Sequence, residues 1–295
     1  MRTVDGFETF PAFEILEPSL QRRPFVFNSP HSGTAYPRSF LRSSRLDRVA
    51  IRRSEDTFVD ELFSGVVGLG APLMRAMFPR AYLDVNREPY ELDPAMFSGR
   101  LPAYVNARSI RVAGGLGTIA RVVADAEEIY REPLSVEEGL ARIDALYKPY
   151  HAALRARLAA TLEAFPFAVL VDCHSMPSTA RGLEHRVRPD IIIGDRFGTS
   201  CSGALTEAAV SILREFGYRV VRNRPYAGGY ITEHYGRPLN GIHALQIEIN
   251  RGLYMDEHHF RRTVGFGALM QDLASFAERL MRVDLAGETI ADAAE

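Results

Sequence analysis

The 295-residue sequence has one lysine, two cysteines and no long apolar run. Its 35 basic and 37 acidic residues give a formal charge of −2, and this balance indicates neither a nucleic-acid footprint nor a patch for anionic membranes. Cys173 and Cys201 are too few for a disulfide scaffold. No apolar stretch approaches the roughly 20 residues that span a bilayer, and the chain starts without a secretory signal pattern. We therefore expect a cytoplasmic protein that binds a small molecule, with no nucleic-acid or membrane partner and an undetermined oligomeric state.

Hydrophobic residues make up 46% of the chain, enough to bury a large core. Apolar runs typical of strands alternate with longer helical patterns, which predicts an α/β fold with a largely buried, mixed sheet. The predicted strands are residues 25–28, 73–78, 81–85, 168–172, 190–193, 219–222 and 244–249. The predicted helices are residues 46–67, 135–164, 199–216 and 256–283.

The organisation along the chain indicates one domain over residues 1–295, with a small, acidic tail after about residue 285 that frays. Ser135 and Glu138 form a capping box at the start of the longest helical pattern, which is either one helix or a pair broken around Pro149. Residues 84–117 are rich in proline, glycine and asparagine and predict a long functional loop.

Two predicted strands run into a histidine, one at His31 and the other at His174. In an open α/β sheet the strand ends open onto the ligand crevice, so two imidazoles far apart in sequence can converge on one ion. A histidine in an apolar run is often a structural residue instead. However, His174 lies in an Asp-Cys-His-Ser sequence, and burying those polar groups without partners would cost on the order of a few kcal/mol. The pattern therefore favours a metal site.

A catalytic zinc site needs a third protein ligand, and two histidines with a carboxylate are one common set. The best source of that carboxylate is the pair Glu55 and Asp56, which opens a helical segment soon after His31. Asp56 is the preferred ligand and Glu55 is the alternative. Asp56 could instead be an N-terminal helix acid that offsets the macrodipole. The expected cofactor is one Zn²⁺ ion per chain, with another divalent metal as the alternative.

Glu248 lies between two isoleucines in the last predicted strand. By the period-two alternation of a strand, Gln246, Glu248 and Asn250 share one face. A buried glutamate beside a metal-activated water is well suited to act first as general base and then as general acid. The alternative is a carboxylate paired with Arg251 or with another structural arginine.

Asn86 and Arg87 stand together after a predicted strand. Arginine binds carboxylates bidentately and asparagine adds a second donor, so the pair predicts a clamp for an anionic substrate, although such pairs also occur by chance. A double glycine ending at Gly229 precedes Tyr230 and His234 and matches neither a Walker nor a dinucleotide fingerprint. A lid or turn is the expected structure there.

Taken together, six separated blocks resemble the N-formylglutamate amidohydrolase family. They are Pro30-His31-Ser32-Gly33 with Tyr36-Pro37, and residues 56–63, 82–87, 172–175, 228–236 and 243–255. The most distinctive blocks read GGYITEHYG and GIHALQIEINRGLYM. This family is related to the zinc carboxypeptidases and to the aspartoacylase and succinylglutamate desuccinylase group. The resemblance implies a three-layer α/β/α domain with a mixed central sheet, of the zinc carboxypeptidase-like (phosphorylase/hydrolase-like) class.

The resemblance carries metal binding onto His31, His174 and one acid of the pair Glu55 and Asp56. The carboxypeptidase relatives have their metal-binding acid three residues after the first histidine, where this chain has Thr34. The position of the acid ligand therefore differs from theirs, and the resemblance does not choose between the two candidate acids.

The implied activity is metal-dependent hydrolysis of N-formyl-L-glutamate to formate and L-glutamate, in histidine breakdown or another route. Glu248 matches the catalytic glutamate of the family, and Asn86 with Arg87 resembles the carboxylate-recognition pair of the carboxypeptidase-like relatives. Asp172 would orient a metal-binding histidine without binding the metal itself. The remaining predicted substrate-binding residues are Gly229, Tyr230 and His234.

Three other functions fit parts of the sequence. Cys173 could act as a nucleophile with His174, but adjacent strand residues point to opposite faces. A zinc-dependent deacylase or carboxypeptidase acting on another N-acyl amino acid or a small peptide would use the same site. A non-catalytic module would bind acidic metabolites through Arg87 and a structural zinc, although the presence of Glu248 argues against it.

Overall fold

The structure, a computed structural model, describes residues 11–179 and 188–285. The frayed tail expected after residue 285 lies outside these residues. The described residues form two compact units. The first unit comprises residues 11–14, 30–55 and 75–154, and the second comprises residues 15–29, 56–74, 155–179 and 188–285. This division does not test the expectation of a single domain, which stays a prediction.

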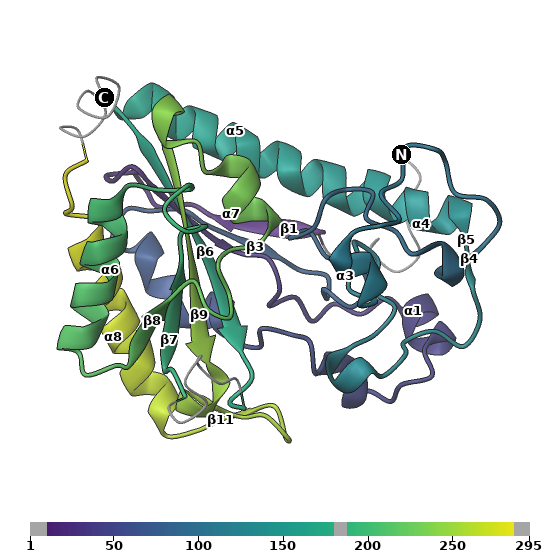
Figure 1. Cartoon of the computed structure of the whole chain (residues 1–295). Helices are drawn as coiled ribbons and strands as arrows, with labels where there is room; N and C mark the ends of the chain where they lie inside the picture. The colour runs from purple at the N-terminus through teal and green to yellow at the C-terminus, as the bar shows by residue number, and fades with distance from the viewer. Residues whose placement is uncertain (1–10, 180–187, 286–295) are drawn as a thin grey trace. The chain divides into compact units, whose positions relative to one another are not determined.

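The main sheet has seven strands and is mixed (Figure 1). Its strands are β1 (Phe13–Leu16), β2 (Phe25–Ser29), β3 (Leu73–Ala76), β6 (Ala168–Met176), β7 (Ile191–Gly194), β8 (Val220–Arg222) and β9 (Ile242–Asn250). They follow the spatial order β1-β3-β2-β6-β9-β7-β8. β2, β6 and β9 are parallel to one another, whereas β7 is antiparallel to β9 and parallel to β8. The predicted α/β fold with a mixed central sheet is therefore confirmed.

Alternation along the central strands separates an apolar face from a polar face. Val169, Val171, Leu245 and Ile247 belong to the hydrophobic core of the second unit, as do residues of three helices. These helices are α2 (Val59–Leu62), α6 (Gly203–Glu215) and α8 (Gly265–Leu280). Because successive strand residues point to opposite faces, the residues between these positions on β6 and β9 face the other way. Helix α7 (Tyr230–Tyr235) contacts β6 and β9, and the residue before it bonds to that polar face.

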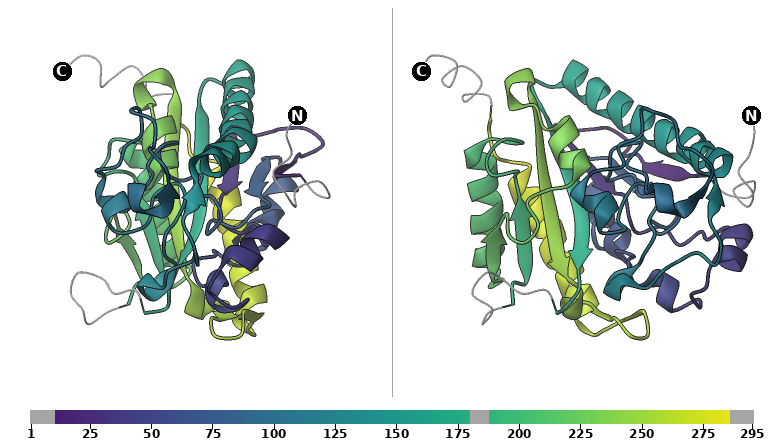
Figure 2. Two further views of the ribbon diagram at one scale, coloured as in Figure 1. Left: turned by 90° about the vertical axis from the view of Figure 1, so that its right-hand side faces the viewer. Right: turned by 45° about the vertical axis from the view of Figure 1, so that its right-hand side comes forward.

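Residues 136–164 form a continuous helical run (Figure 2). It consists of α4 (Val136–Arg142), the π-helical segment η5 (Ile143–Tyr147) and α5 (Lys148–Ala164). Ser135 caps its start, because the Ser135 Oγ accepts a 3.0 Å hydrogen bond from the Glu138 N–H. Pro149 does not break the run. Proline has no N–H to donate to the carbonyl four residues earlier, and the π-helical segment just before it accommodates this interruption.

Three side chains of this run bond to the backbone of residues 82–87, and we call them the helix clamp. The bonds join Arg142 Nη1 to the Tyr82 carbonyl (3.3 Å), His151 Nε2 to the Val85 carbonyl (2.8 Å) and Tyr147 Oη to the Arg87 carbonyl (2.7 Å). The Arg142 side chain is fully buried, and its guanidinium lies 4.0 Å from the centroid of the Tyr82 ring. The clamp therefore fixes a segment that has no regular secondary structure of its own.

That segment is where the predicted strand at residues 81–85 is wrong. The N–H groups of Tyr82 and Leu83 both donate to the Pro79 carbonyl, at 3.0 and 3.3 Å, so the chain turns instead of extending. The expected long loop that follows contains three short elements. They are η3 (Pro94–Met96), β4 (Phe97–Ser98), which pairs with β5 (Leu134–Ser135), and α3 (Ile110–Ala113).

Two predicted helices are shorter or more broken than expected. Residues 46–67 contain η1 (Ala50–Arg52), α2 and η2 (Ser64–Val67) instead of one helix. Phe58 has a left-handed φ of 67°, which a right-handed helix cannot contain. The last helix begins only at Gly265, because β10 (Met255–Asp256) and β11 (Arg261–Arg262) form a hairpin before it.

The other short elements are α1 (Arg38–Ser43), η4 (Ala124–Ala126), η6 (Pro238–Asn240) and η7 (Arg251–Leu253). Of all the helices within residues 11–179 and 188–285, none combines the length and the apolar character needed to cross a membrane.

Candidate active site

The polar face of β6 and β9 brings together predicted site residues of the second unit. The strand register places Asp172 beside Gln246, and His174 beside Glu248. Asn28 on β2 stands next to Asp172 on its other side, and the Asn28 Nδ2 donates to Asp172 Oδ1 at 2.7 Å. All five side chains are buried. Two adjacent rows of polar groups thus cross the sheet where a soluble protein would normally place apolar ones.

His174 lies between two carboxylates. Its Nε2 is 2.8 Å from Asp172 Oδ2, and its Nδ1 is 3.0 Å from Asp56 Oδ2. Burial alone would lower the pKa of His174, but Asp172 and Asp56 outweigh burial and hold that pKa well above its usual range. Surroundings that stabilise an imidazolium in this way also favour a divalent cation.

Asp56 is held on one side so that its other oxygen remains directed at His174. Asp56 Oδ1 accepts hydrogen bonds from Ser175 Oγ at 3.0 Å and from Arg251 Nη2 at 3.2 Å. Arg251 Nε also donates to Ser175 Oγ at 3.0 Å. Asp56 precedes α2, whose first-turn acids are Asp60 and Glu61, so it is not the helix-terminal acid of the alternative hypothesis.

His31 follows β2 by two residues and is oriented by Asp84. Its Nε2 lies 2.8 Å from Asp84 Oδ1. Burial raises the pKa of Asp84, but Arg80, Arg87 and His31 outweigh burial and hold that pKa well below its usual range. Asp84 is therefore an ionised carboxylate that fixes the ring of His31. The sequence did not assign this role to Asp84.

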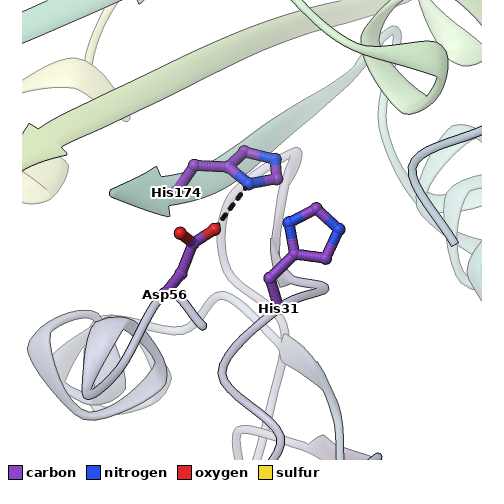
Figure 3. A group of neighbouring side chains, drawn as sticks. All are labelled: His31, Asp56 and His174. Atoms are coloured by element: carbon purple, nitrogen blue, oxygen red, sulfur yellow. Dashed lines mark hydrogen bonds and ion pairs between the residues drawn. The ribbon is translucent and has the colours of Figure 1, made fainter. Parts of the chain in front are cut away.

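One ligand atom each from His31, Asp56 and His174 lies within 4.8 Å of the other two (Figure 3). All three residues are buried. Two imidazole nitrogens and a carboxylate oxygen form a donor set that zinc commonly takes in catalytic sites. The Nε2 of each histidine is bonded to a carboxylate, Asp84 or Asp172, as is typical of metal-binding histidines. The residues present therefore fit a divalent metal.

Glu55, the alternative acid, is already bonded elsewhere. Arg52 Nε donates to both of its carboxylate oxygens, at 3.0 and 3.1 Å. The Tyr36 hydroxyl donates to Glu55 Oε1 at 2.5 Å. The close group of three potential ligands contains Asp56 and does not contain Glu55.

Glu248 is connected through Gln246 to Gly228 and Gly229, which we call the glycine loop. Gln246 Nε2 donates to Glu248 Oε1 at 2.8 Å, and Gln246 Oε1 accepts from the Gly229 N–H at 2.7 Å. Arg251, the alternative partner of Glu248, bonds to Asp56. The predicted general base and the predicted substrate residue Gly229 therefore share one bridging amide.

The other predicted substrate-binding residues, Tyr230 and His234, belong to α7, and their rings stack on each other. The rings of Tyr230 and His234 lie 4.9 Å apart with an interplanar angle of 19°. Burial, together with the positive charges of Arg237 and Arg155, lowers the pKa of His234. His234 is therefore a neutral ring in positive surroundings.

Asn86 and Arg87 both belong to the first unit. Asn86 is buried, and the Arg87 side chain is 12% exposed. Arg87 Nε donates to the Leu116 carbonyl at 2.7 Å, and its Nη1 donates to the Asn86 carbonyl at 2.8 Å. The guanidinium thus has partners within the protein, and its role as a substrate clamp stays a prediction.

Cys173 lies on the opposite face of β6 from His174. It is fully buried in the hydrophobic core, and burial raises the pKa of its thiol well above the usual value. A neutral thiol directed away from the polar face is a poor nucleophile. The structure thus supports the argument against a cysteine mechanism.

Three residues of the site had no assigned role from the sequence: Asp84, Ser175 and Gln246. The alternation of β9 placed Gln246 on the correct face, and this signal could have assigned it to the site. Asp84, two residues before Asn86, gave only the weaker signal of an acid next to a polar pair. Its function depends on a contact with His31, 53 residues away in the chain.

The family model for N-formylglutamate amidohydrolase matches residues 23–255, a range that includes His31, Asp56, His174 and Glu248. The N-formylglutamate deformylase of Pseudomonas aeruginosa is 30% identical over 248 residues, covering 83% of this chain and 86% of that protein. The protein of the same name from Pseudomonas putida is 29% identical over 239 residues, covering 80% of this chain and 83% of its own.

Solved structures show the same relationship. The crystal structure of N-formylglutamate amidohydrolase from Ralstonia eutropha JMP134 superposes with a TM-score of 0.86 at 37% identity, over 92% of this chain and 97% of that one. A gene product of Agrobacterium tumefaciens shares the fold, with a TM-score of 0.65 at 19% identity over 96% of both chains. The resemblance inferred from six sequence blocks is therefore confirmed, and the chain belongs to the N-formylglutamate amidohydrolase family.

Proposed function

We propose that this chain is a metal-dependent amidohydrolase that cleaves N-formyl-L-glutamate to formate and L-glutamate. The single observation that carries the proposal is the buried group of His31, Asp56 and His174, in a chain whose relatives are named N-formylglutamate deformylases. The positions of Glu248 and Asp172 beside His174 add the groups that such a hydrolysis needs. Zinc is the proposed metal.

His31, Asp56 and His174 would hold the ion through the group of atoms described above. When bound, zinc lowers the pKa of a water molecule from 15.7 towards roughly 7 and polarises the amide carbonyl. Asp84 and Asp172 accept hydrogen bonds from the Nε2 atoms of the two histidines, which orients both rings.

Glu248 is the proposed general base. Its carboxylate accepts a proton from the attacking water and returns it to the leaving amine of glutamate, so that one group serves both proton transfers. The Gln246 amide holds Glu248 Oε1 in place. Asn86 with Arg87 is the proposed receptor for the α-carboxylate of the substrate.

We also infer a three-layer α/β/α arrangement of the zinc carboxypeptidase-like class. It is supported by the helices α2, α6 and α8 against the apolar face of the sheet and by α7 on the polar face. The second candidate function, a zinc-dependent deacylase or carboxypeptidase for another N-acyl amino acid or small peptide, would use the same residues.

The test is formate release from N-formyl-L-glutamate by the purified protein, before and after treatment with a chelator and after adding back zinc. N-acetyl- and N-succinyl-L-glutamate are run in parallel, and Glu248→Gln serves as the variant without the general base. We expect formyl-selective turnover that is lost with the metal, restored by zinc and nearly abolished in Glu248→Gln. Zinc-dependent cleavage of another acyl group alone would favour the second candidate function. Turnover that survives metal removal would refute the metal mechanism.

A further inference from the structure

A left-handed turn follows β7 and presents the side chain of Arg196. Arg196, Phe197 and Gly198 have φ angles of 52°, 57° and 85°. L side chains rarely adopt this region of backbone conformation, and two consecutive non-glycine residues in it persist only where the surrounding structure holds them. Such conformations cluster at functional sites.

Asp195 and Asn223 hold this turn. Asn223 Oδ1 accepts from the N–H groups of Asp195 and Phe197, at 3.0 and 3.4 Å. Asp195 Oδ1 accepts from the Gly198 N–H at 3.0 Å and from Asn223 Nδ2 at 2.6 Å. The Asp195 side chain is fully buried. The backbone at Arg196 is therefore fixed by a buried polar network.

The Arg196 side chain reaches the glycine loop. Its Nη1 donates to the Gly228 carbonyl at 3.3 Å, and its Nη2 pairs with Glu233 Oε2 on α7 at 2.7 Å. The next residue, Gly229, donates to Gln246, which in turn holds Glu248. Arg196 thus lies beside the backbone that connects to the proposed general base through Gln246.

The guanidinium of Arg196 is accessible and already holds a carboxylate. Its side chain is 30% exposed, and its partner Glu233 is 54% exposed. An exposed ion pair contributes little to stability, so an incoming carboxylate can replace that of Glu233 at low cost. The positive charges of Arg155 and Arg237, which lower the pKa of His234 on the same helix, add to the attraction for an anion.

The substrate in the proposed function has two carboxylates, and the predicted clamp of Asn86 and Arg87 accounts for one of them. We propose that Arg196 forms the subsite for the side-chain carboxylate of an N-acyl dicarboxylic amino acid, and that Glu233 occupies this subsite until the substrate displaces it. This inference rests on the proposed function and adds the residue that selects glutamate over glutamine. A planar guanidinium on a fixed backbone is suited to that selection because it pairs with a carboxylate bidentately and with an amide only once.

The test compares kcat and KM for N-formyl-L-glutamate and N-formyl-L-glutamine in the wild type, Arg196→Gln and Arg196→Lys, each loaded with zinc. We expect Arg196→Gln to raise KM for the glutamate substrate roughly tenfold or more, with kcat and the glutamine substrate changed less than about threefold. Arg196→Lys should give a KM for the glutamate substrate between those of the wild type and Arg196→Gln. A partly misfolded variant loses activity on both substrates equally. The ratio of kcat/KM for the two substrates therefore does not depend on the folded fraction.

The matched control is Arg219→Gln, which removes another exposed arginine that pairs with a carboxylate, that of Asp190, and should leave the ratio of kcat/KM for the two substrates unchanged. Glu233→Gln removes the competing carboxylate and should lower KM for N-formyl-L-glutamate about two- to fivefold. Equal losses for both substrates in Arg196→Gln, or no loss for either, would overturn the subsite. A higher KM in Glu233→Gln would overturn the displacement. Wild-type protein with no formylglutamate turnover would instead refute the proposed function itself.

Discussion

Gln246 donates a 2.8 Å hydrogen bond from its Nε2 to Oε1 of Glu248, two residues further along the same strand. Both side chains are buried on the polar face of β9. The same amide accepts a hydrogen bond from the Gly229 N–H through its Oε1. The proposed general base and the loop proposed to contact the substrate are therefore positioned by one side chain, so a substitution at Gln246 should affect both.

Replacing Gln246 with methionine should lower kcat for N-formyl-L-glutamate at least about tenfold and the free energy of unfolding by about 1–3 kcal/mol, since a buried carboxylate and a backbone N–H each lose a hydrogen bond. Steady-state formate release and urea unfolding measure the two effects. Gln21→Met is the control, because Gln21 also bridges two polar side chains. These are Arg157 and Thr161, which belong to α5. An equal loss of kcat in both variants would contradict a specific role for Gln246.

Asp84→Asn and Asp172→Asn should each weaken metal binding by roughly 10- to 100-fold, because each carboxylate orients a histidine of the proposed metal site. Competition against a metal-binding dye or chelator measures the affinity directly, without any dependence on turnover. Asp190→Asn is the control, because that carboxylate pairs with Arg219 and has no contact with a histidine among its described bonds. Unchanged affinity in both site variants would mean that the ion binds elsewhere.

Gly33→Ala should destabilise the protein by about 1–3 kcal/mol or more and reduce zinc affinity. A Cβ at Gly33 would lie 2.3 Å from the Phe78 carbonyl oxygen and 2.5 Å from the Met77 carbonyl carbon, so the backbone two residues after His31 has to move. Thermal unfolding and metal titration measure these effects. Gly203→Ala, at a helix start with open space where the new methyl group would lie, should change neither.

Asp195 should contribute stability that depends on pH. Burial raises its pKa, but hydrogen bonds from Asn223, Arg222 and the Gly198 N–H outweigh burial and lower that pKa below the ordinary value of 3.8. The contribution is therefore present above pH 3.8 and is lost as the pH falls through the lower pKa of the folded state.

Asp195→Asn should accordingly reduce the free energy of unfolding by about 1–3 kcal/mol at pH 7 and by less at acidic pH. Urea unfolding of the variant and the wild type at several pH values between neutral and strongly acidic gives the comparison. A difference between the two proteins that stays constant across this range would show that the charge of Asp195 does not stabilise the fold.

Asp56 was predicted from the need for a carboxylate soon after His31. His174 and Glu248 were predicted from the strand-end pattern and from the alternation of β9. These positions are governed by local rules: a buried parallel strand reads as an apolar run, and the residue at its end opens onto the ligand crevice. The same rules placed Cys173 on the core face. The central strands were predicted well for this reason, although β6 and β9 extend further than expected.

The residues that were missed depend on contacts made at long range. The stretch around Asp84 has the composition of a strand, but the Pro79 carbonyl turns it and the helix clamp fixes it from more than 50 residues away. The break at Phe58 is a backbone conformation that no composition signals. Arg196 owes its position to Asp195 and Asn223, the latter on a different loop. Periodicity alone could identify none of these relationships.

The π-helical segment at Ile143–Tyr147 also determines which changes of length this region tolerates. It lies between Arg142 and His151, so it sets the angle at which the two side chains leave the helix. Deleting a single residue there would rotate every later position by about 100° and direct His151 away from the Val85 carbonyl. Point substitutions on the exposed side of this helix should therefore be accepted readily, whereas insertions and deletions of one residue should be selected against in any functional descendant of this protein.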